Sequence, residues 1–208
     1  MKIGLIDVDG HNFPNLALMK ISAWHKQQGD IVDWWNGLET YDKVYVAKVF
    51  DETYTKDMEY CIQADEVVKG GTGYGLDNKL PDEIEHIYPD YKLYGIKNKA
   101  YGFLTRGCPR HCEFCIVGDK EGLRSDKVAD LTEFWNGQKY VKLLDPNLLA
   151  SKDSKDSIEL LKQLVDSKAK IDFTQGLDIR CVTDEKINLI NNLNLEVIHF
   201  AWDNYEFK

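Results

Sequence analysis

Three of the five cysteines in this chain of 208 residues fall within one stretch of eight residues. They are Cys108, Cys112 and Cys115, spaced C-x-x-x-C-x-x-C in the segment Arg-Gly-Cys-Pro-Arg-His-Cys-Glu-Phe-Cys. Cysteines so close together make a poor disulfide framework, whereas their thiolates can converge on one inorganic centre. A structural zinc site usually has four protein ligands, but an iron–sulfur cluster held by three thiolates leaves one iron open. The spacing therefore favours a metal centre with three protein thiolates.

This loop, with Phe114 just before the last cysteine and a strand-like segment at 100–106 before the first, resembles the signature loop of the radical S-adenosylmethionine (radical SAM) enzymes. The resemblance implies that Cys108, Cys112 and Cys115 bind a [4Fe–4S] cluster and that the amino and carboxylate groups of SAM chelate the open iron. In that family the reduced cluster cleaves SAM to a 5′-deoxyadenosyl radical, which abstracts hydrogen from a substrate. A flavodoxin- or ferredoxin-like electron donor is then an implied partner.

A zinc site is the alternative interpretation of the same loop. His111, Cys61 or Cys181 would have to supply the fourth ligand. His111 directly precedes Cys112, which is an awkward position for both side chains to reach one ion, and the two other cysteines are distant in sequence. We interpret Cys61 and Cys181 as packing residues.

Composition bounds the remaining classes. Hydrophobic residues make up 43% of the chain and the net charge is −9, which is typical of an ordered globular protein and does not indicate nucleic-acid binding through bulk charge. No apolar run approaches the roughly 20 residues that cross a bilayer, and no signal-peptide pattern is seen at the start. We expect a cytoplasmic protein without a membrane partner, where clustered cysteines are more often metal ligands than disulfides.

The first part of the chain alternates between strand-like and helical patterns, which predicts an N-terminal Rossmann-like α/β domain with a parallel sheet over 1–75. Asn15 is the expected cap of a helix that ends near Gly29. Further elements are expected as strands at 31–35, 43–50 and 65–69 and as a helix at 55–63. Residues 76–98, which contain Pro81 and Pro89, are predicted to be a linker.

Two features of this first domain resemble the cobalamin-binding-type domains that precede some radical SAM barrels. One is Asp9-Gly-His11-Asn-Phe-Pro14 after the first strand, and the other is the strand at 65–69 that runs into Gly70 and Gly71. The family pattern for a cobalt-ligating histidine is D-x-H-x-x-G, and Pro14 stands at the position of its glycine. Cobalamin is thus a further cofactor that the resemblance raises.

Residues 99–208 repeat a βα pattern, with strands expected at 100–106, 139–144, 170–175 and 196–201 and helices at 130–135, 157–165 and 184–193. Thr183 is the expected N-cap of the last helix. This resembles part of a radical SAM barrel, whose active site lies at the carboxyl ends of the strands. The resemblance implies four cofactor contacts at those ends: Asp145 to the SAM ammonium, Gln175 to the ribose, Arg180 to a carboxylate, and Asp203 near the adenine or substrate.

The predicted function is therefore that of a radical SAM enzyme with an unknown substrate. The alternative is a non-catalytic zinc or iron–sulfur module, or a radical SAM remnant without turnover. Since the βα series accounts for only part of a barrel, a partner chain that completes the barrel is also considered.

Overall fold

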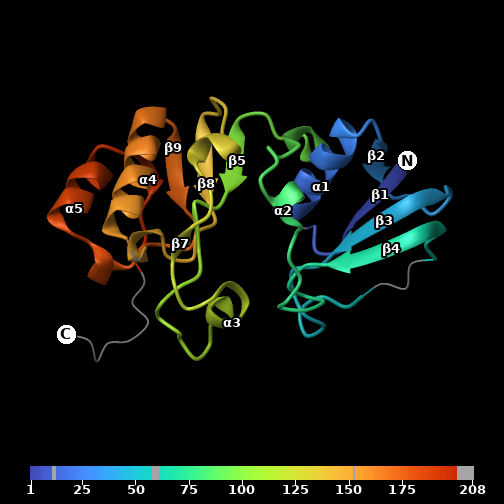
Figure 1. The fold of residues 1–208 in the computed structure, drawn as a ribbon, viewed down its shortest axis with the longest axis horizontal. Coiled ribbons are helices and arrows are strands. Elements are labelled where there is room, and N and C mark those ends of the chain that lie inside the picture. The colour runs from blue at the N-terminus through green and yellow to red at the C-terminus, as the bar shows by residue number, and fades with distance from the viewer. Residues whose placement is uncertain (11–12, 58–60, 152, 201–208) are drawn as a thin grey trace. The chain divides into compact units, whose positions relative to one another are not determined.

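The computed structural model describes residues 1–10, 13–57, 61–151 and 153–200. The chain divides into two compact units, Met1–Ile96 and Lys97–Lys208 (Figure 1). Each unit contains a four-stranded sheet whose neighbouring strands are parallel. The predicted α/β class with a parallel sheet is confirmed at this level.

The first unit orders its strands β2-β1-β3-β4. Its elements are β1 (Lys2–Asp7), α1 (Leu16–Gln27), β2 (Ile31–Trp34), β3 (Tyr41–Ala47), β4 (Ala64–Gly70), α2 (Asp82–Glu85) and the 3-10 helix η1 (Tyr91–Tyr94). The Asn15 side chain accepts a hydrogen bond from the Leu18 backbone N–H, at 3.1 Å, so the predicted helix cap is confirmed. Gly29 follows the helix with φ 83°, a backbone conformation that glycine adopts without strain.

Helices α1 and α2 cover one face of the first sheet (Figure 1). On this face β1 and α1 form a core with Val32, Ala47 and Ile84, to which β1 contributes Ile3 and Leu5. Residues 76–96 belong to this unit, because Ile84 lies in that core and the Tyr94 hydroxyl donates to Asp7 at 2.5 Å.

One predicted helix in the first unit is absent where the structure describes it. Residues 55–57 and 61–63, the described ends of the segment 55–63, are not helical. The carboxylate of Asp57 instead accepts from Lys48, Lys69 and Tyr74. These hydrogen bonds tie Asp57 to side chains that lie in or just after β3 and β4.

The second unit orders its strands β10-β9-β8-β5. Its elements are β5 (Lys99–Gly102), β6 (Thr105–Arg106), α3 (Val117–Glu121), β7 (Asp126–Lys127), η2 (Leu131–Glu133), β8 (Tyr140–Leu143), η3 (Leu148–Ala150), α4 (Ser154–Ser167), β9 (Lys170–Phe173), η4 (Ile179–Cys181), α5 (Asp184–Asn191) and β10 (Asn194–Val197). One side of α4 is buried and carries Leu160, Leu161 and Leu164. Thr183 caps α5 through its side chain, as predicted.

Two expected elements of the second unit differ. The strand at 100–106 is split into β5 and β6, and β6 pairs antiparallel with β7 instead of joining the parallel sheet. The helix at 130–135 is only the short 3-10 helix η2, closed by a capping box between Asp130 and Glu133. A complete barrel is not formed by the described strands, which make an open sheet of four.

Candidate functional site

The cysteine loop, residues 107–125, is an excursion between the paired strands β6 and β7. Its base is closed by a hydrogen bond from the Cys108 backbone N–H to the Gly122 carbonyl at 3.1 Å. The Arg106 guanidinium donates to both oxygens of Glu121, at 2.9 and 3.1 Å, and so ties the end of α3 to β6. Figure 1 shows α3 beyond the arrowheads of the parallel strands, the end at which α/β proteins place their ligands.

The turn before this loop is fixed by Asp145, the second residue after β8. Its carboxylate accepts from the Leu104 N–H at 3.1 Å, the Thr105 N–H at 2.5 Å and the Thr105 hydroxyl at 2.8 Å. Only 4% of Asp145 is exposed. Burial raises the pKa of this carboxyl to about 6, against the opposing effect of these hydrogen bonds. These hydrogen bonds hold the chain between β5 and β6, while the contact of Asp145 with the SAM ammonium group remains a prediction.

A polar cluster, which we define as Arg110, Asn147, Asp178 and Arg180, lies next to Cys108; Asn147 and Asp178 are buried, whereas both arginines are partly exposed. Asp178, which is 5% exposed, receives the guanidinium of Arg110 on Oδ2 and the Nε–H of Arg180 on Oδ1 at 2.9 Å. Burial alone would raise the pKa of Asp178, but the hydrogen bonds from Arg180 and Arg110 bring it below its usual value. Asp178 is therefore an ionised anchor between the cysteine loop and the segment after β9.

Asn147 links this anchor to the first cysteine. Its Nδ2 lies 3.4 Å from Asp178 Oδ2 and 3.6 Å from the Cys108 sulfur. Only 3% of Asn147 is exposed, and its Oδ1 is buried without a partner among the described residues. A buried, unsatisfied amide oxygen is costly, so this position is suited to a hydrogen-bond donor on a bound molecule.

The thiols themselves are only loosely arranged. Cys108 and Cys112 are half-buried and Cys115 is exposed, and none of the five cysteines, all of which are described, is in a disulfide. Within the described part of the chain, no three Cys, His, Asp or Glu side chains are gathered closely enough to hold a metal ion. The donor set still suits an iron–sulfur cluster, because three thiols share one exposed loop beside a buried hydrogen-bond donor.

The additional ligands considered for zinc are placed differently. His111 adopts φ 47°, and its ring packs against Gly118, whose added Cβ would lie 3.0 Å from His111 Nδ1. Cys181 lies beside Arg110, with 3.8 Å between the sulfur and Nη2, and burial raises its pKa. Cys61 is exposed and belongs to the first unit.

The remaining residues predicted to contact the cofactor, Gln175, Arg180 and Asp203, differ in their surroundings. Gln175 is exposed just after β9, and its amide is accessible to a ligand. Arg180 has 38% of its side chain exposed while it is bound to Asp178. Asp203 lies outside the described residues.

In the first unit, the expected cobalamin features are only partly visible. His11 lies outside the described residues. Asp9 Oδ2 accepts from the backbone N–H of Val49 and Phe50. A Cβ at Gly71 would lie 2.2 Å from the Lys48 carbonyl oxygen, so this glycine permits close packing against the end of β3. Cobalamin binding remains a prediction.

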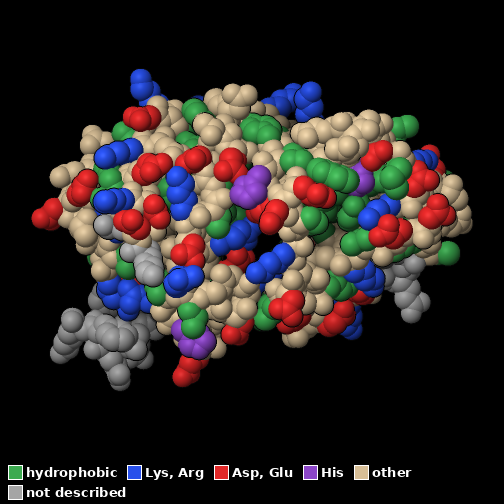
Figure 2. Space-filling view, in the orientation of Figure 1, with side chains coloured by type: hydrophobic (Ala, Val, Ile, Leu, Met, Phe, Trp, Pro, Cys, Tyr) green, Lys and Arg blue, Asp and Glu red, His purple; other side chains and the backbone are tan. Residues whose placement is uncertain are grey.

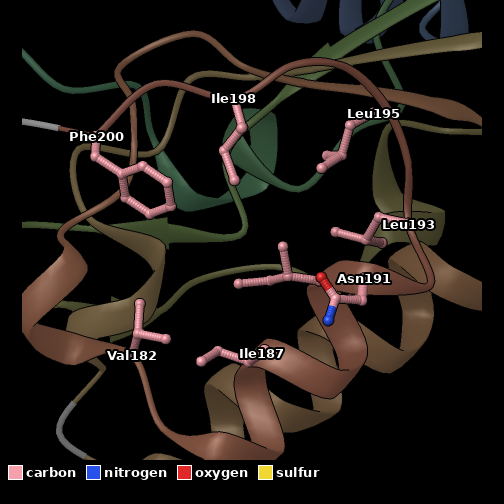
Figure 3. Close-up of a pocket in the computed structure, with 8 residues that line it drawn as sticks. Val182, Ile187, Asn191, Leu193, Leu195, Ile198 and Phe200 are labelled. Atoms are coloured by element: carbon pink, nitrogen blue, oxygen red, sulfur yellow. The ribbon is translucent and has the colours of Figure 1, made fainter.

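An apolar pocket of about 390 Å³ lies at the β10 side of the second unit. Figure 3 shows Ile198 and Phe200 pointing into it from one side and Ile187 from the other. Among the described residues its lining is apolar except for Asn191; the residues are Val182, Ile187, Ile190, Asn191, Leu193, Leu195, Ile198 and Phe200.

The visible surface mixes acidic and basic side chains (Figure 2). Among the described helices, none combines the length and the apolar character that crossing a bilayer requires.

Comparisons with known proteins add no assignment. No protein-family model matches the chain, and no match was found among curated proteins.

Sequence reasoning missed Arg110, Asn147 and Asp178. Asn147 follows Asp145-Pro146 at a strand end, and Asp178 precedes Arg180 by two residues, a spacing that suits a side-chain cap. Both patterns can be seen in the sequence, but only the fold brings Asn147 and Asp178 together next to Cys108.

Proposed function

We propose that this chain is a radical SAM protein in which Cys108, Cys112 and Cys115 hold a [4Fe–4S] cluster and SAM binds at the remaining iron. The observation that carries the proposal is the cysteine loop itself: three thiols, spaced C-x-x-x-C-x-x-C, on a loop that follows the edge strand β5 of a parallel sheet. The polar cluster next to Cys108 supports it, because hydrogen-bonded neighbours orient metal ligands and tune the metal.

When bound, the reduced cluster would supply the electron that cleaves SAM to a 5′-deoxyadenosyl radical. The chain's own residues would position the cofactor. Gln175 offers an exposed amide for a ribose hydroxyl, and Arg180 offers a guanidinium for a carboxylate. Asp203 is proposed to contact the adenine or the substrate. A flavodoxin- or ferredoxin-like protein would deliver the electron.

A second candidate is a metal-binding module without turnover, containing zinc or an iron–sulfur cluster. The open sheet favours it, because the described strands β10, β9, β8 and β5 do not close around a reaction site. A partner chain that extends the sheet beyond β10 would remove this objection.

Anaerobic reconstitution with iron and sulfide, followed by reduction and addition of SAM, distinguishes the candidates. We expect about four irons per chain, a brown chromophore and release of 5′-deoxyadenosine. Stoichiometric zinc with no chromophore would contradict the proposal, and a full cluster without SAM cleavage would favour the module.

The ligand assignment is tested with a matched pair of cysteine variants. Cys112→Ala should lose the chromophore, while Cys181→Ala, which removes a nearby thiol outside the motif, should keep it. Loss of the cluster in both variants would reopen the assignment of Cys181 as a packing residue.

A further inference from the structure

The amide of Asn147 has an orientation that its neighbours determine. Two acceptors, the Asp178 carboxylate at 3.4 Å and the Cys108 sulfur at 3.6 Å, face Nδ2. The flipped amide would bring its oxygen against both of these electron-rich atoms. Nδ2 therefore donates one hydrogen to Asp178 and the other to Cys108.

This donor is also held rigidly. Asp178, which fixes one N–H of the amide, is itself held by Arg110 and Arg180. At the backbone, the Asn147 carbonyl accepts from the buried Ser125 hydroxyl at 2.8 Å. Only 3% of Asn147 is exposed, so water has little access to the amide itself.

We infer that Asn147 raises the reduction potential of the cluster by donating a hydrogen bond to the sulfur of Cys108. This inference rests on the proposed function. Reduction adds one electron to the cluster without a proton, and part of the added negative charge falls on the thiolate sulfurs. A fixed N–H dipole aimed at one sulfur stabilises the reduced form more than the oxidised form. Asn147 is thus a tuning residue that acts through Cys108 and makes electron acceptance from the donor protein easier.

The experiment is an anaerobic redox titration of the reconstituted full chain, monitored by the electron paramagnetic resonance (EPR) signal of the reduced cluster. Asn147→Leu keeps the branched shape and the number of heavy atoms and removes the donor, and Asp178 retains both arginines. We expect the equilibrium constant for reduction to fall about tenfold, which corresponds to about 59 mV for a one-electron couple. The control is Ser151→Ala, which lies in the same loop. It removes a buried hydroxyl that has no hydrogen-bond partner among the described residues. This control should leave the potential unchanged.

An unshifted potential in Asn147→Leu, or an equal shift in Ser151→Ala, would overturn the inference. The proposed function would still hold in either case, because the cluster would have assembled. Absence of any cluster in the unmodified chain would overturn both.

If Asn147→Leu assembles no cluster, the inference is tested on the unmodified chain instead. Pulsed EPR after labelling asparagine side chains with ¹⁵N should show a weak nitrogen coupling to the reduced cluster. Absence of that coupling would overturn the inference.

Discussion

Thr105 donates both its backbone N–H and its hydroxyl to the same carboxylate oxygen of Asp145, 40 residues away in sequence. The contact joins the segment before the cysteine loop to the end of β8. It also explains why the chain leaves the parallel sheet after β5, since the N–H groups of Leu104 and Thr105 bind a side chain instead of a neighbouring strand.

The carboxyl of Asp145 should make stability depend on pH. Its folded-state pKa of about 6 lies above the ordinary value of 3.8, so between these values the folded state binds a proton that the unfolded state releases. Stability from this group is therefore lost as pH rises through about 4 to 6. At about 1.4 kcal/mol per pKa unit, the full change is about 3 kcal/mol.

Asp145→Asn provides the comparison, because it keeps the shape and does not titrate. Urea unfolding at a series of pH values should show the wild type gaining stability relative to Asp145→Asn on acidification from pH 7 to 4. Parallel stability curves would show that the carboxyl does not titrate in this window.

Gly107, which precedes the first cysteine, should not tolerate a side chain. It adopts φ 84°, and an added Cβ would lie 1.9 Å from the Arg124 carbonyl oxygen. Gly122 has a similar φ of 97° but nothing within 4 Å of an added Cβ. Gly122→Ala should therefore cost only the strain of its backbone conformation, φ 97° and ψ 168°, which is essentially confined to glycine, or roughly 1–3 kcal/mol. Gly107→Ala should cost roughly 3 kcal/mol or more, because backbone must move.

Chemical denaturation of the two alanine variants measures this difference. Reconstituted iron content should also fall in Gly107→Ala and remain in Gly122→Ala. Equal costs would mean that the base of the cysteine loop can shift freely.

Removing the charge of Asp178 should loosen the cysteine loop. In Asp178→Asn the new amide nitrogen would face the donors of Arg110 or Arg180, so the loop loses its anchor. We expect a cost of about 2 kcal/mol, below the value for a fully buried ion pair because both arginines are partly exposed.

Hydrogen–deuterium exchange should be faster over residues 107–116 in Asp178→Asn. Asp172→Asn is the control, since Asp172 pairs with Lys142 on β8 at 2.7 Å. Unchanged protection of 107–116 would indicate that other contacts hold the loop.

In the first unit, Lys48 should matter more than Lys69 although both bind Asp57. The Lys48 side chain is fully buried and also pairs with Glu52 at 2.5 Å, whereas 55% of the Lys69 side chain is exposed. Lys48→Met should therefore lower the urea midpoint clearly, and Lys69→Met should change it little. Similar midpoints for the two variants would argue against this buried pair as a stabilising contact.

The local signals in the sequence predicted much of the fold. Asn15 and Thr183 could be identified as helix caps because their side chains bond to backbone only a few residues away. Hydrophobic patterns placed the strands of both parallel sheets within a few residues. The split at 100–106 could not be predicted in this way, since it depends on Asp145, which is far along the chain.

Of the candidate site, the sequence alone predicted the three cysteines but not the polar residues around them. The spacing of the cysteines is local, whereas the cluster around Asp178 combines residues from three separate segments. The contact of Arg180 with a carboxylate of SAM remains a prediction, whereas the contact of Arg110 with Asp178 joins segments far apart in the sequence and could not be predicted from local spacing.

The register of the second sheet also has a consequence for the order of folding. Lys99 pairs with Tyr140, Tyr140 with Lys170 and Lys170 with Asn194, so the sequence distance between partners shortens towards the C-terminus. Closing a longer loop costs more chain entropy and slows pairing. We expect β8, β9 and β10 to associate before β5 joins them. The segment that carries the three thiols would then stay unstructured until β5 docks, so its thiols would come into place only at the end of folding.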